Sequence, residues 1–495
     1  MKGKTQSQRG LVFREEEIFG RGSPGRRGVD FADNGVPLAD PGEALPGGCL
    51  RGDLPGFPEL SEPEVIRHYT RLSQWNYGVD SNMYPLGSCT MKHNPRINEA
   101  VSRLKGFTGL HPYQPDTAAQ GTLKLMHDLG EWLCEITGLD AATLQPAAGA
   151  HGEFAGLLMI RAALAKRGDA RKKVLLPDSS HGTNPASAVL CGYDAVTIKS
   201  NGDGKINVEE LDRLMDNDVA ALMVTNPNTL GIFESNIVKI AEIVHERGGF
   251  VYCDGANLAA LMGKARFGDM GVDVAHINLH KTFSTPHGGG GPGAGPVLVT
   301  KELAPFLPVP VVVENDGVYS LDHDRPQSVG RIHGFNGNIG VLIRAAAYIL
   351  TMGAKGLTEA TEAAVINANY IRARLSSHYN VPFQGRSMHE CVLNDRLQNE
   401  RGVTTLDIAK GLIDRGFHPP TIYFPLIVRG ALMIEPTETE PKETLDAFCD
   451  AMIDIAEKAE TDPESLRRAP VSSVRRRLDE TMAARNPELR CSLCG

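Results

Sequence analysis

The fold is decided by Val274-Ala-His-Ile-Asn-Leu-His-Lys281, an apolar strand that ends in polar residues and runs directly into the glycine-rich segment 282–292. Most lysines in proteins are solvated surface residues. A partly buried lysine at a strand end, beside a tight glycine-rich turn, is instead typical of a Schiff-base nucleophile. The interpretation of Lys281 therefore depends on the residues that surround it.

Short apolar runs alternate with helical stretches between residues 140 and 300. This alternation predicts βαβ units, a mostly parallel sheet and helices on both of its faces, which is an α/β fold. The predicted strands are 174–178, 195–198, 220–226, 250–254, 274–278 and 297–300, and the predicted helices include 154–166, 237–247 and one that begins after Ser61.

A smaller unit is predicted toward the C-terminus. Helical patterns at 340–380 and 443–460 enclose short strands at 421–424 and 431–434, which is typical of an α+β domain. Residues 1–60, rich in Gly, Pro and charge, cannot form a core of their own and are expected to be an extended arm. The predicted organisation is an arm at 1–60, a large domain at 61–335 and a small domain with its tail at 336–495.

Four of the predicted strands end in a polar residue, namely Asp178, Asn226, Asp254 and Asn278. Ligands of open α/β sheets bind outside the carboxyl ends of the strands, so we expect a site at this edge. A carboxylate at the depth of Asp254 can keep a pyridine nitrogen protonated, which would make pyridoxal phosphate an electron sink. Asp254 alone would also fit a helix cap or a turn.

A candidate phosphate cradle precedes the helix predicted at 154–166. The small residues Ala148, Gly149 and Ala150, with His151, let backbone N–H groups approach an anion at a helix N-terminus. Glycine-rich turns before helices are common, so this run does not identify a site alone. His181 lies just past a strand end, where it could lie flat on an aromatic cofactor or be structural.

Composition excludes several classes of protein. A net charge of −9 argues against binding to duplex nucleic acid or anionic membranes. No apolar leader or membrane-length apolar run is evident, and the nine cysteines are an odd number thinly spread, so we expect a soluble cytoplasmic protein. The terminal Cys491 and Cys494 are interpreted as a solvated tail, a redox pair or half of a metal site.

Two motifs are expected to be misleading. Residues 201–210 imitate part of an EF-hand loop, but Lys199 occupies the first ligand position and a strand precedes it, so no metal is expected. The glycine run 288–295 suggests a dinucleotide loop, but Pro292, Pro296 and the strand after them do not fit strand–turn–helix.

Five blocks of sequence make the chain resemble the glycine decarboxylase family, the P-proteins of the glycine cleavage system, and specifically the second subunit of their split bacterial form. The resemblance runs from about residue 60 to residue 485. The chain departs from the family pattern at His93, at His151, where Gln is usual, and at Arg429-Gly430, where Pro-Glu is more usual. The blocks are Tyr84-Pro-Leu-Gly-Ser-Cys-Thr-Met-Lys92, His181-Gly-Thr-Asn-Pro-Ala-Ser187, Asn226-Pro-Asn-Thr-Leu-Gly231, Asn278-Leu-His-Lys-Thr282 and Met433-Ile-Glu-Pro-Thr-Glu-Thr439.

The resemblance implies a fold-type I pyridoxal 5'-phosphate enzyme with the aspartate aminotransferase-like architecture. Lys281 would then be the Schiff-base lysine, Asp254 would pair with the pyridinium nitrogen, and His181 and Ala256 would enclose the ring. The remaining implied residues are Asn226 and Thr229 at the O3′ edge, Ala148, Gly149, Ala150, His151 and His280 at the phosphate, and Ser88, Cys89 and Thr90 at the substrate end.

The resemblance also implies a reaction and its partners. Glycine would lose CO2 and pass its aminomethyl group to the lipoyl arm of H-protein, with the proton transfers assigned to either Lys281 or His181. Single-chain members contain two homologous halves, so this lysine-bearing half should require subunit 1 in an α2β2 heterotetramer. Two alternatives stay open: another pyridoxal phosphate enzyme, such as an aminotransferase or cysteine desulfurase, and a non-catalytic scaffold half.

Overall fold

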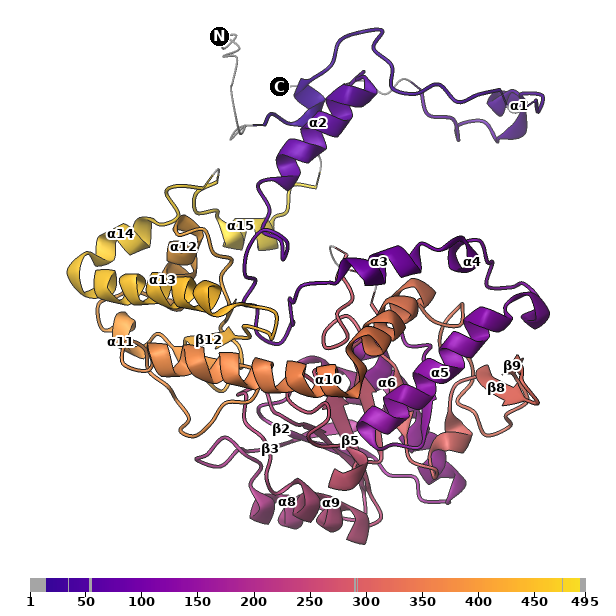
Figure 1. Cartoon of the computed structure of the whole chain (residues 1–495), viewed down its shortest axis with the longest axis vertical. Coiled ribbons are helices and arrows are strands. Elements are labelled where there is room, and N and C mark those ends of the chain that lie inside the picture. The colour runs from indigo at the N-terminus through magenta and orange to yellow at the C-terminus, as the bar shows by residue number, and fades with distance from the viewer. Residues whose placement is uncertain are drawn as a thin grey trace. The chain divides into compact units, whose positions relative to one another are not determined.

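A seven-stranded sheet, built from residues 141–299, is the largest sheet of the computed structural model (Figure 1). Five neighbouring strands are parallel, in the order β6–β5–β4–β2–β3, and β7 runs antiparallel between β6 and β1. The six predicted strands are confirmed, with ends that shift by a residue or two. The bounds are β1 Ala141–Thr143, β2 Lys173–Pro177, β3 Asp194–Ile198, β4 Val219–Thr225, β5 Phe250–Gly255, β6 Val274–Ile277 and β7 Val297–Val299.

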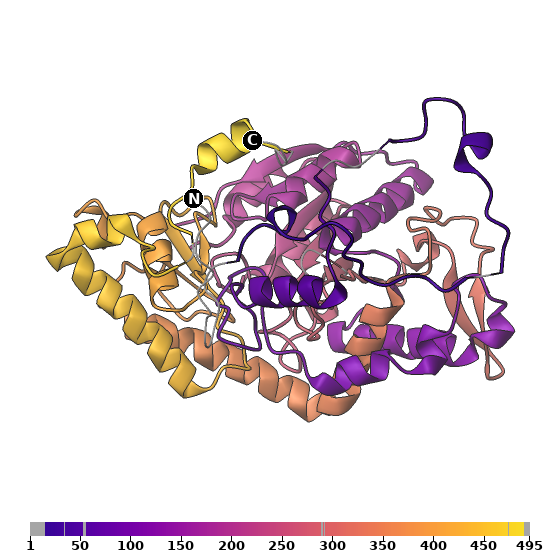
Figure 2. The same ribbon diagram turned by 90° about the horizontal axis from the view of Figure 1, so that it is seen from above.

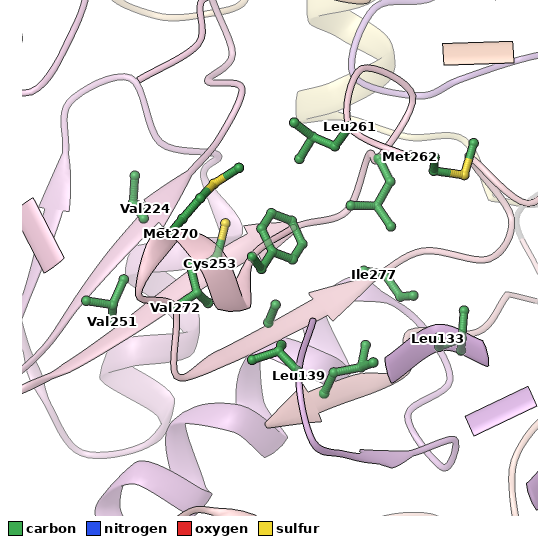
Figure 3. Close-up of a cluster of buried hydrophobic side chains, with 14 of the residues drawn as sticks. Leu133, Leu139, Val224, Val251, Cys253, Leu261, Met262, Met270, Val272 and Ile277 are labelled. Atoms are coloured by element: carbon green, nitrogen blue, oxygen red, sulfur yellow. The ribbon is translucent and has the colours of Figure 1, made fainter. Parts of the chain in front are cut away.

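Both faces of the sheet are buried, because side chains alternate between two cores. Along β5, Val251 and Cys253 enter one core (Figure 3), whereas Phe250 and Tyr252 enter the other. The first core is closed by α5 Gln120–Thr137, α8 Val208–Leu214, α9 Ile237–Glu246 and the first half of α10 Ile339–Leu375, and the second by α6 Gly149–Lys166 and α7 Thr183–Leu190.

Helix α6 begins at Gly149, five residues before the predicted start at 154. It packs directly on the sheet, because a Cβ at Gly152 would lie 2.8 Å from the Cβ of His276 and one at Gly156 would lie 2.4 Å from the Tyr252 ring. The two glycines therefore let the helix approach the strands more closely than any other residue would allow. This close packing brings the N-terminus of α6 to the carboxyl edge of the sheet.

A second, three-stranded antiparallel sheet, ordered β10–β12–β11, packs against helices in the C-terminal part of the chain. In Figure 2, α10 passes from the large sheet to this smaller layer, where it lies beside α13. α10 is long and apolar enough to span a membrane by length and composition, but its backbone is non-helical at Gly353. Many of its residues are buried, in the first core of the large sheet and in the core of the smaller layer. The bounds are β10 Cys391–Asn394, β11 Thr421–Ile422, β12 Ala431–Ile434, α12 Thr405–Asp414 and α13 Lys442–Thr461.

The structure describes residues 15–33, 35–52, 56–288, 291, 293–473 and 475–489, so Cys491, Cys494 and part of the glycine run lie outside it. Residues 79–467 form one compact unit, and the described residues before Val79 and after Arg467 form another. In the latter, α2 begins directly after Ser61, as expected, and Ser61 and Glu64 form a capping box at its start. The predicted divisions at 60 and 335 stay predictions.

The remaining elements are short. The hairpin of β8 and β9 was not predicted. The bounds are η1 Ile18–Gly20, α1 Pro41–Ala44, α2 Glu62–Ser73, α3 Arg96–Ser102, α4 Lys105–Thr108, η2 Asp116–Ala118, η3 Gly268–Met270, η4 Ala304–Phe306, β8 Val311–Asn315, β9 Val318–Asp322, α11 Arg396–Asn399, α14 Pro463–Arg468 and α15 Glu480–Arg485.

Candidate active site

A cavity of about 150 Å³ lies at the carboxyl ends of β4, β5 and β6. Strand pairing explains its position, since these strands are adjacent and parallel and so end at the same edge of the sheet. Its lining includes Ser88, Gly149, Ala150, Glu153, His181, Thr183, Thr229, Asp254, Ala256, Asn257, His276, Asn278, Lys281, His389 and Glu390.

Lys281 is held by the turn after β6. Its backbone N–H donates to the carbonyl of Asn278 at 3.1 Å, and its own carbonyl accepts from the backbone of Ser284 at 3.2 Å. The half-buried side chain lines the cavity. The next residue is fixed as well, because buried Lys92 donates from Nζ to the carbonyl of Thr282 at 2.6 Å. A primary amine is thus presented to the cavity from a rigid turn.

Asp254 is buried at the end of β5 and makes three polar contacts. Its Oδ2 accepts from Asn184 at 2.9 Å, and its Oδ1 lies 3.1 Å from both Nε2 of His276 and the backbone N–H of Ala256. Burial alone would raise the pKa of Asp254, but His276 and the donated hydrogen bonds hold it well below its usual range. The same contact raises the pKa of buried His276, against the effect of its burial.

The Asp254 carboxylate is therefore ionised deep in the cavity. His276 is fixed in turn by Tyr252, whose hydroxyl lies 2.8 Å from Nδ1. An ionised carboxylate held in a low-dielectric site is what a cationic ring nitrogen requires as its partner.

The N-terminus of α6 forms the cradle expected from the small residues. Gly149 and Ala150, in its first turn, line the cavity. A Cβ at Gly149 would lie 2.9 Å from the Asn278 amide, and one at Gly295 would lie 2.2 Å from the carbonyl of Ala148. Exposed backbone N–H groups and the helix dipole make this end suitable for a phosphate.

The residues present fit pyridoxal phosphate. The amine of Lys281, the carboxylate of Asp254 and the cradle of α6 line one cavity. Oδ1 of Asn278, in the same lining, is buried without a hydrogen-bond partner among the described residues. An unsatisfied buried acceptor of this kind marks a position where a bound group or ordered water is expected.

His181, Ala256 and Thr229 also line the cavity, as predicted from the resemblance. Nδ1 of His181 accepts from the backbone of Thr183 at 3.3 Å, which orients the ring. Thr229 donates to the carbonyl of Ser179, so its hydroxyl is engaged by a neighbouring loop. Their roles toward the cofactor stay predictions.

Four other predicted site residues are not among those that line the cavity: Ala148, His151, Asn226 and His280. Asn226 uses its Oδ1 to accept from the backbone of Glu234 at 3.0 Å. His151 accepts from Ala147 and stacks with a second histidine, and His280 accepts from the backbone of Ala294. Burial lowers the pKa of His280 to about 4, so it is a neutral imidazole near the cradle. Ala148 is the N-cap residue of α6.

Asp178 does not join the other strand ends. Its Oδ1 accepts from the backbone and the hydroxyl of Ser200, in the turn after β3. Of the four strand-end residues, Asp254 and Asn278 line the cavity, whereas Asp178 and Asn226 do not, and the turn after β3 takes up the Asp178 carboxylate.

The segment 84–92 carries Ser88, Cys89 and Thr90, whose expected place at the substrate end stays a prediction. Ser88 and Thr90 have left-handed backbones, with φ of 64° and 21°. Ser88 lines the cavity, whereas Cys89 and Thr90 lie beside it. Burial raises the pKa of the Cys89 thiol, with Lys281 opposing and Glu435 adding to the shift. A neutral thiol favours a packing role over a nucleophilic one.

Sequence reasoning missed three acidic or basic residues at this end, namely His389, Glu390 and Glu435. Glu390 immediately precedes β10 and Glu435 immediately follows β12, and these strands pair antiparallel with Cys391 opposite Ile434. The register therefore places the two glutamates beside each other. The sequence does show a glutamate directly before the apolar run of β10 and another directly after the predicted strand β12. Nothing in the local sequence indicates that these two strands pair.

Two groups of side chains bring potential ligand atoms within 4.8 Å of one another: Glu153 with Asp254 and His276, and His389 with Glu390 and Glu435. In the first group, both Glu153 oxygens accept from hydroxyls and Asp254 is paired with His276. In the calcium-like loop 201–210, Oδ1 of Asn201 is occupied, because it accepts hydrogen bonds from two backbone N–H groups of its own turn. The absence of a metal stays a prediction.

Comparison with known proteins gives one consistent result. Residues 50–412 match the family model "Glycine cleavage system P-protein", and residues 360–471 match "Glycine dehydrogenase, C-terminal domain". The chain is 57% identical to a probable glycine dehydrogenase (decarboxylating) subunit 2 from Bacillus licheniformis, over 96% of this chain and 98% of that protein. A protein of the same name from Caldanaerobacter subterraneus is 60% identical over 92% and 93% of the two chains.

Solved structures agree on the fold. A crystal structure of glycine decarboxylase (P-protein) in inhibitor-bound form superposes with a TM-score of 0.68 at 23% identity, covering 84% of this chain and 93% of that one. An aspartate aminotransferase from Thermus thermophilus gives 0.57 at 14% identity, over 76% and 99%. The expected fold-type I class, its pyridoxal phosphate cofactor and the glycine decarboxylase activity are confirmed. Because the P-protein family model matches residues 50–412 and the relative from Bacillus licheniformis matches 96% of the chain, the chain belongs to the P-protein family of the glycine cleavage system.

Proposed function

We propose that this chain is the lysine-bearing subunit of a two-subunit glycine decarboxylase, which releases CO2 from glycine and passes the aminomethyl group to the lipoyl arm of H-protein. The observation that carries the proposal is the placement of Lys281 and ionised Asp254 in one cavity, above the N-terminus of α6. Retention of both residues argues against a non-catalytic scaffold.

The residues divide the work of binding and orientation. Lys281 would hold the cofactor covalently, and Asp254, fixed by His276 and Asn184, would keep its ring nitrogen protonated. The backbone of Gly149 and Ala150 would hold the phosphate. When bound, pyridoxal phosphate accepts the electron pair that is released as CO2 leaves.

The substrate end suits loss of a carboxylate. The described lining of the cavity contains no arginine, the side chain that most often clamps a carboxylate through two hydrogen bonds. Lys281 and the histidines are the basic groups there. A substrate carboxylate bound there would lack the bidentate arginine clamp that suits a reaction in which the carboxylate is retained, which supports the proposed decarboxylation.

The proposed partners are inferred from the relatives and from the chain itself. Its relatives are named as subunit 2, which supports assembly with a subunit 1, and we propose an α2β2 heterotetramer. H-protein would deliver the lipoyl group. The acidic composition and thinly spread cysteines support a cytoplasmic location.

The first test is spectroscopic. The purified chain, with its partner subunit, should bind pyridoxal phosphate and show the visible absorption band of a lysine-bound cofactor. Lys281→Ala should lose that band, whereas Lys264→Ala, which removes a surface lysine paired with Glu362, should keep it. A wild-type protein that stays colourless with excess cofactor would contradict the assignment.

The second test addresses the reaction. CO2 release from carboxyl-labelled glycine should require the partner subunit and lipoylated H-protein together. Conversion of glycine to glyoxylate with amination of an added keto acid, without CO2 release and without H-protein, would instead indicate an aminotransferase.

A further inference from the structure

Two glutamates are buried side by side at the substrate end of the cavity. Glu390 and Glu435 are 3% and 1% exposed, and their carboxyl oxygens lie within 4.8 Å of each other and of a His389 ring nitrogen. The antiparallel pairing of β10 and β12 creates this contact, since both glutamates leave the same end of the ladder. Like charges at this separation in a dry site favour a single shared proton.

Hydrogen bonds distinguish the two carboxyl groups. Glu435 accepts three: from the hydroxyl of Thr90 at 2.6 Å, from its backbone N–H at 3.2 Å and from Asn257 at 2.8 Å. Glu390 accepts one, from the backbone N–H of Ser88 at 2.9 Å. Burial raises the pKa of both carboxyl groups, but the hydrogen bonds from Thr90 and Asn257 oppose this shift at Glu435, so the charge resides on Glu435 and the proton on Glu390.

The neighbouring groups do not remove that proton. Burial lowers the pKa of His389 to about 3, so this imidazole is neutral. The other titratable groups that face the pair are Lys281, His287 and the thiols of Cys89 and Cys391. Among them, the charge of Lys281 lowers the pKa of both glutamates. Burial and the charge of Glu435 together raise the pKa of Glu390 to about 8.

We propose that Glu390 is the proton donor at the substrate end of the cavity, and that Glu435 is a positioning residue that keeps the proton on it. Glu390 lines the same cavity as Lys281, so an acid stands beside the reacting group. This assignment departs from our expectation that either Lys281 or His181 manages every proton transfer.

The role rests on the proposed function, in which the reaction needs one proton. The carbon–carbon bond of glycine breaks and CO2 leaves, a carbon–sulfur bond forms to one sulfur of the lipoyl group, and the sulfur–sulfur bond breaks. The other sulfur leaves as a thiolate. Glu390 gives its proton to that thiolate and then regains one from solvent, so charge and atoms balance.

A measurement on the folded protein without turnover tests the proton itself. Because the pKa of Glu390 is raised on folding, its contribution to stability is full below about 4.5 and is lost as the pH rises toward about 8. The unfolding constant of wild type relative to Glu390→Gln should therefore increase about tenfold per pH unit across this window. The glutamine oxygen can still accept from Ser88, so the variant should fold.

Glu435→Gln is the matched variant. Without the neighbouring charge, Glu390 should ionise at lower pH, and the slope should move to more acidic values. In the infrared spectrum at neutral pH, wild type should show a protonated carboxyl band that Glu390→Gln lacks and that surface variant Glu362→Gln keeps. A ratio of the wild-type and Glu390→Gln unfolding constants that does not change with pH would contradict the shared proton. An infrared carboxyl band that is unchanged in Glu390→Gln would contradict it as well.

Turnover then tests the role. With partner subunit and H-protein, Glu390→Gln should bind pyridoxal phosphate with an unchanged absorption band but release CO2 more slowly by about 10²–10⁴-fold. A wild-type enzyme that is itself inactive would refute the proposed function instead. Wild-type rates in Glu390→Gln, or a stoichiometric divalent metal lost with Glu390, would overturn the assignment of a proton donor.

Discussion

The buried ion pair of Lys92 and Glu438 yields a quantitative prediction. The Lys92 ammonium is 3% exposed and donates to Glu438 at 2.5 Å, to Thr282 at 2.6 Å and to the hydroxyl of Tyr348 at 3.1 Å, which uses all three of its protons. Burial would lower the pKa of Lys92, but Glu438 and Tyr348 raise it above its ordinary value. The pair is therefore charged on the lysine side at neutral pH.

Lys92→Met removes the cation and leaves the Glu438 carboxylate, only 9% exposed, with Tyr348 as its one remaining donor among the described residues. Losing one member of a buried pair costs about 3–5 kcal/mol. We expect urea unfolding to show a loss of this size, because the methionine fills the space but supplies no charge. The carbonyl of Thr282 also loses its donor, so the absorption band of the cofactor on Lys281 should weaken.

Lys92→Met with Glu438→Gln completes a double-mutant cycle. Removing both charges should be less costly than Lys92→Met alone, since no uncompensated carboxylate remains, and a coupling energy of about 1–3 kcal/mol is expected. Additive losses in the double variant would refute the reasoning, because they would mean that the two side chains act independently. The surface pair Lys355 and Glu359 supplies the control cycle, in which less than about 0.5 kcal/mol is expected.

Two further predictions concern the cradle and the thiol. Gly295→Ala would place a Cβ 2.2 Å from the carbonyl oxygen of Ala148, so the start of α6 must shift. We expect the free energy of unfolding to fall by about 1–3 kcal/mol and pyridoxal phosphate to bind more weakly in an equilibrium titration. Gly182→Ala, which has open space around the added Cβ, should bind the cofactor normally. Cys89→Ala should change kcat/KM for glycine decarboxylation by an amount that corresponds to less than about 1 kcal/mol of activation free energy, because the thiol is neutral and only packs. A decrease in steady-state kcat/KM that corresponds to several kcal/mol would assign Cys89 to the chemistry instead.

The parallel sheet could be predicted because each buried strand is a continuous apolar run. The observed bounds of β12 equal the predicted ones and those of β5 agree within one residue, and the ends of the large-sheet strands located Asp254 and Lys281. The surroundings of a side chain just past a strand end are less determined by the strand itself. Asp178 has the same pattern as Asp254, but Ser200 occupies its carboxylate, and this contact depends on the path of a different turn.

The carboxyl pair could not be predicted from local pattern. Glu390 and Glu435 come from separate strands of the smaller sheet, and their meeting with Lys281 depends on how segment 84–92 connects that sheet to the cavity. Gly87 shows this dependence, because a Cβ there would lie 2.6 Å from the carbonyl of Met433 on β12. A backbone approach of this kind is a property of tertiary packing and has no periodic signal in the chain.

Two carboxyl groups in the lining of the cavity are buried to a similar extent yet are held in opposite protonation states. Asp254 is 5% exposed and ionised, because His276 and two further donors compensate its charge. Glu390 is 3% exposed and protonated, because its nearest carboxyl neighbour has taken the available donors. Burial alone would raise both pKa values, so the partners decide the difference. The ionised carboxylate of Asp254 suits a permanent cationic partner, whereas the neutral carboxyl group of Glu390 can give up a proton and recover it. That division is what an enzyme needs when one carboxyl group must hold charge through every turnover and another must change it once per cycle.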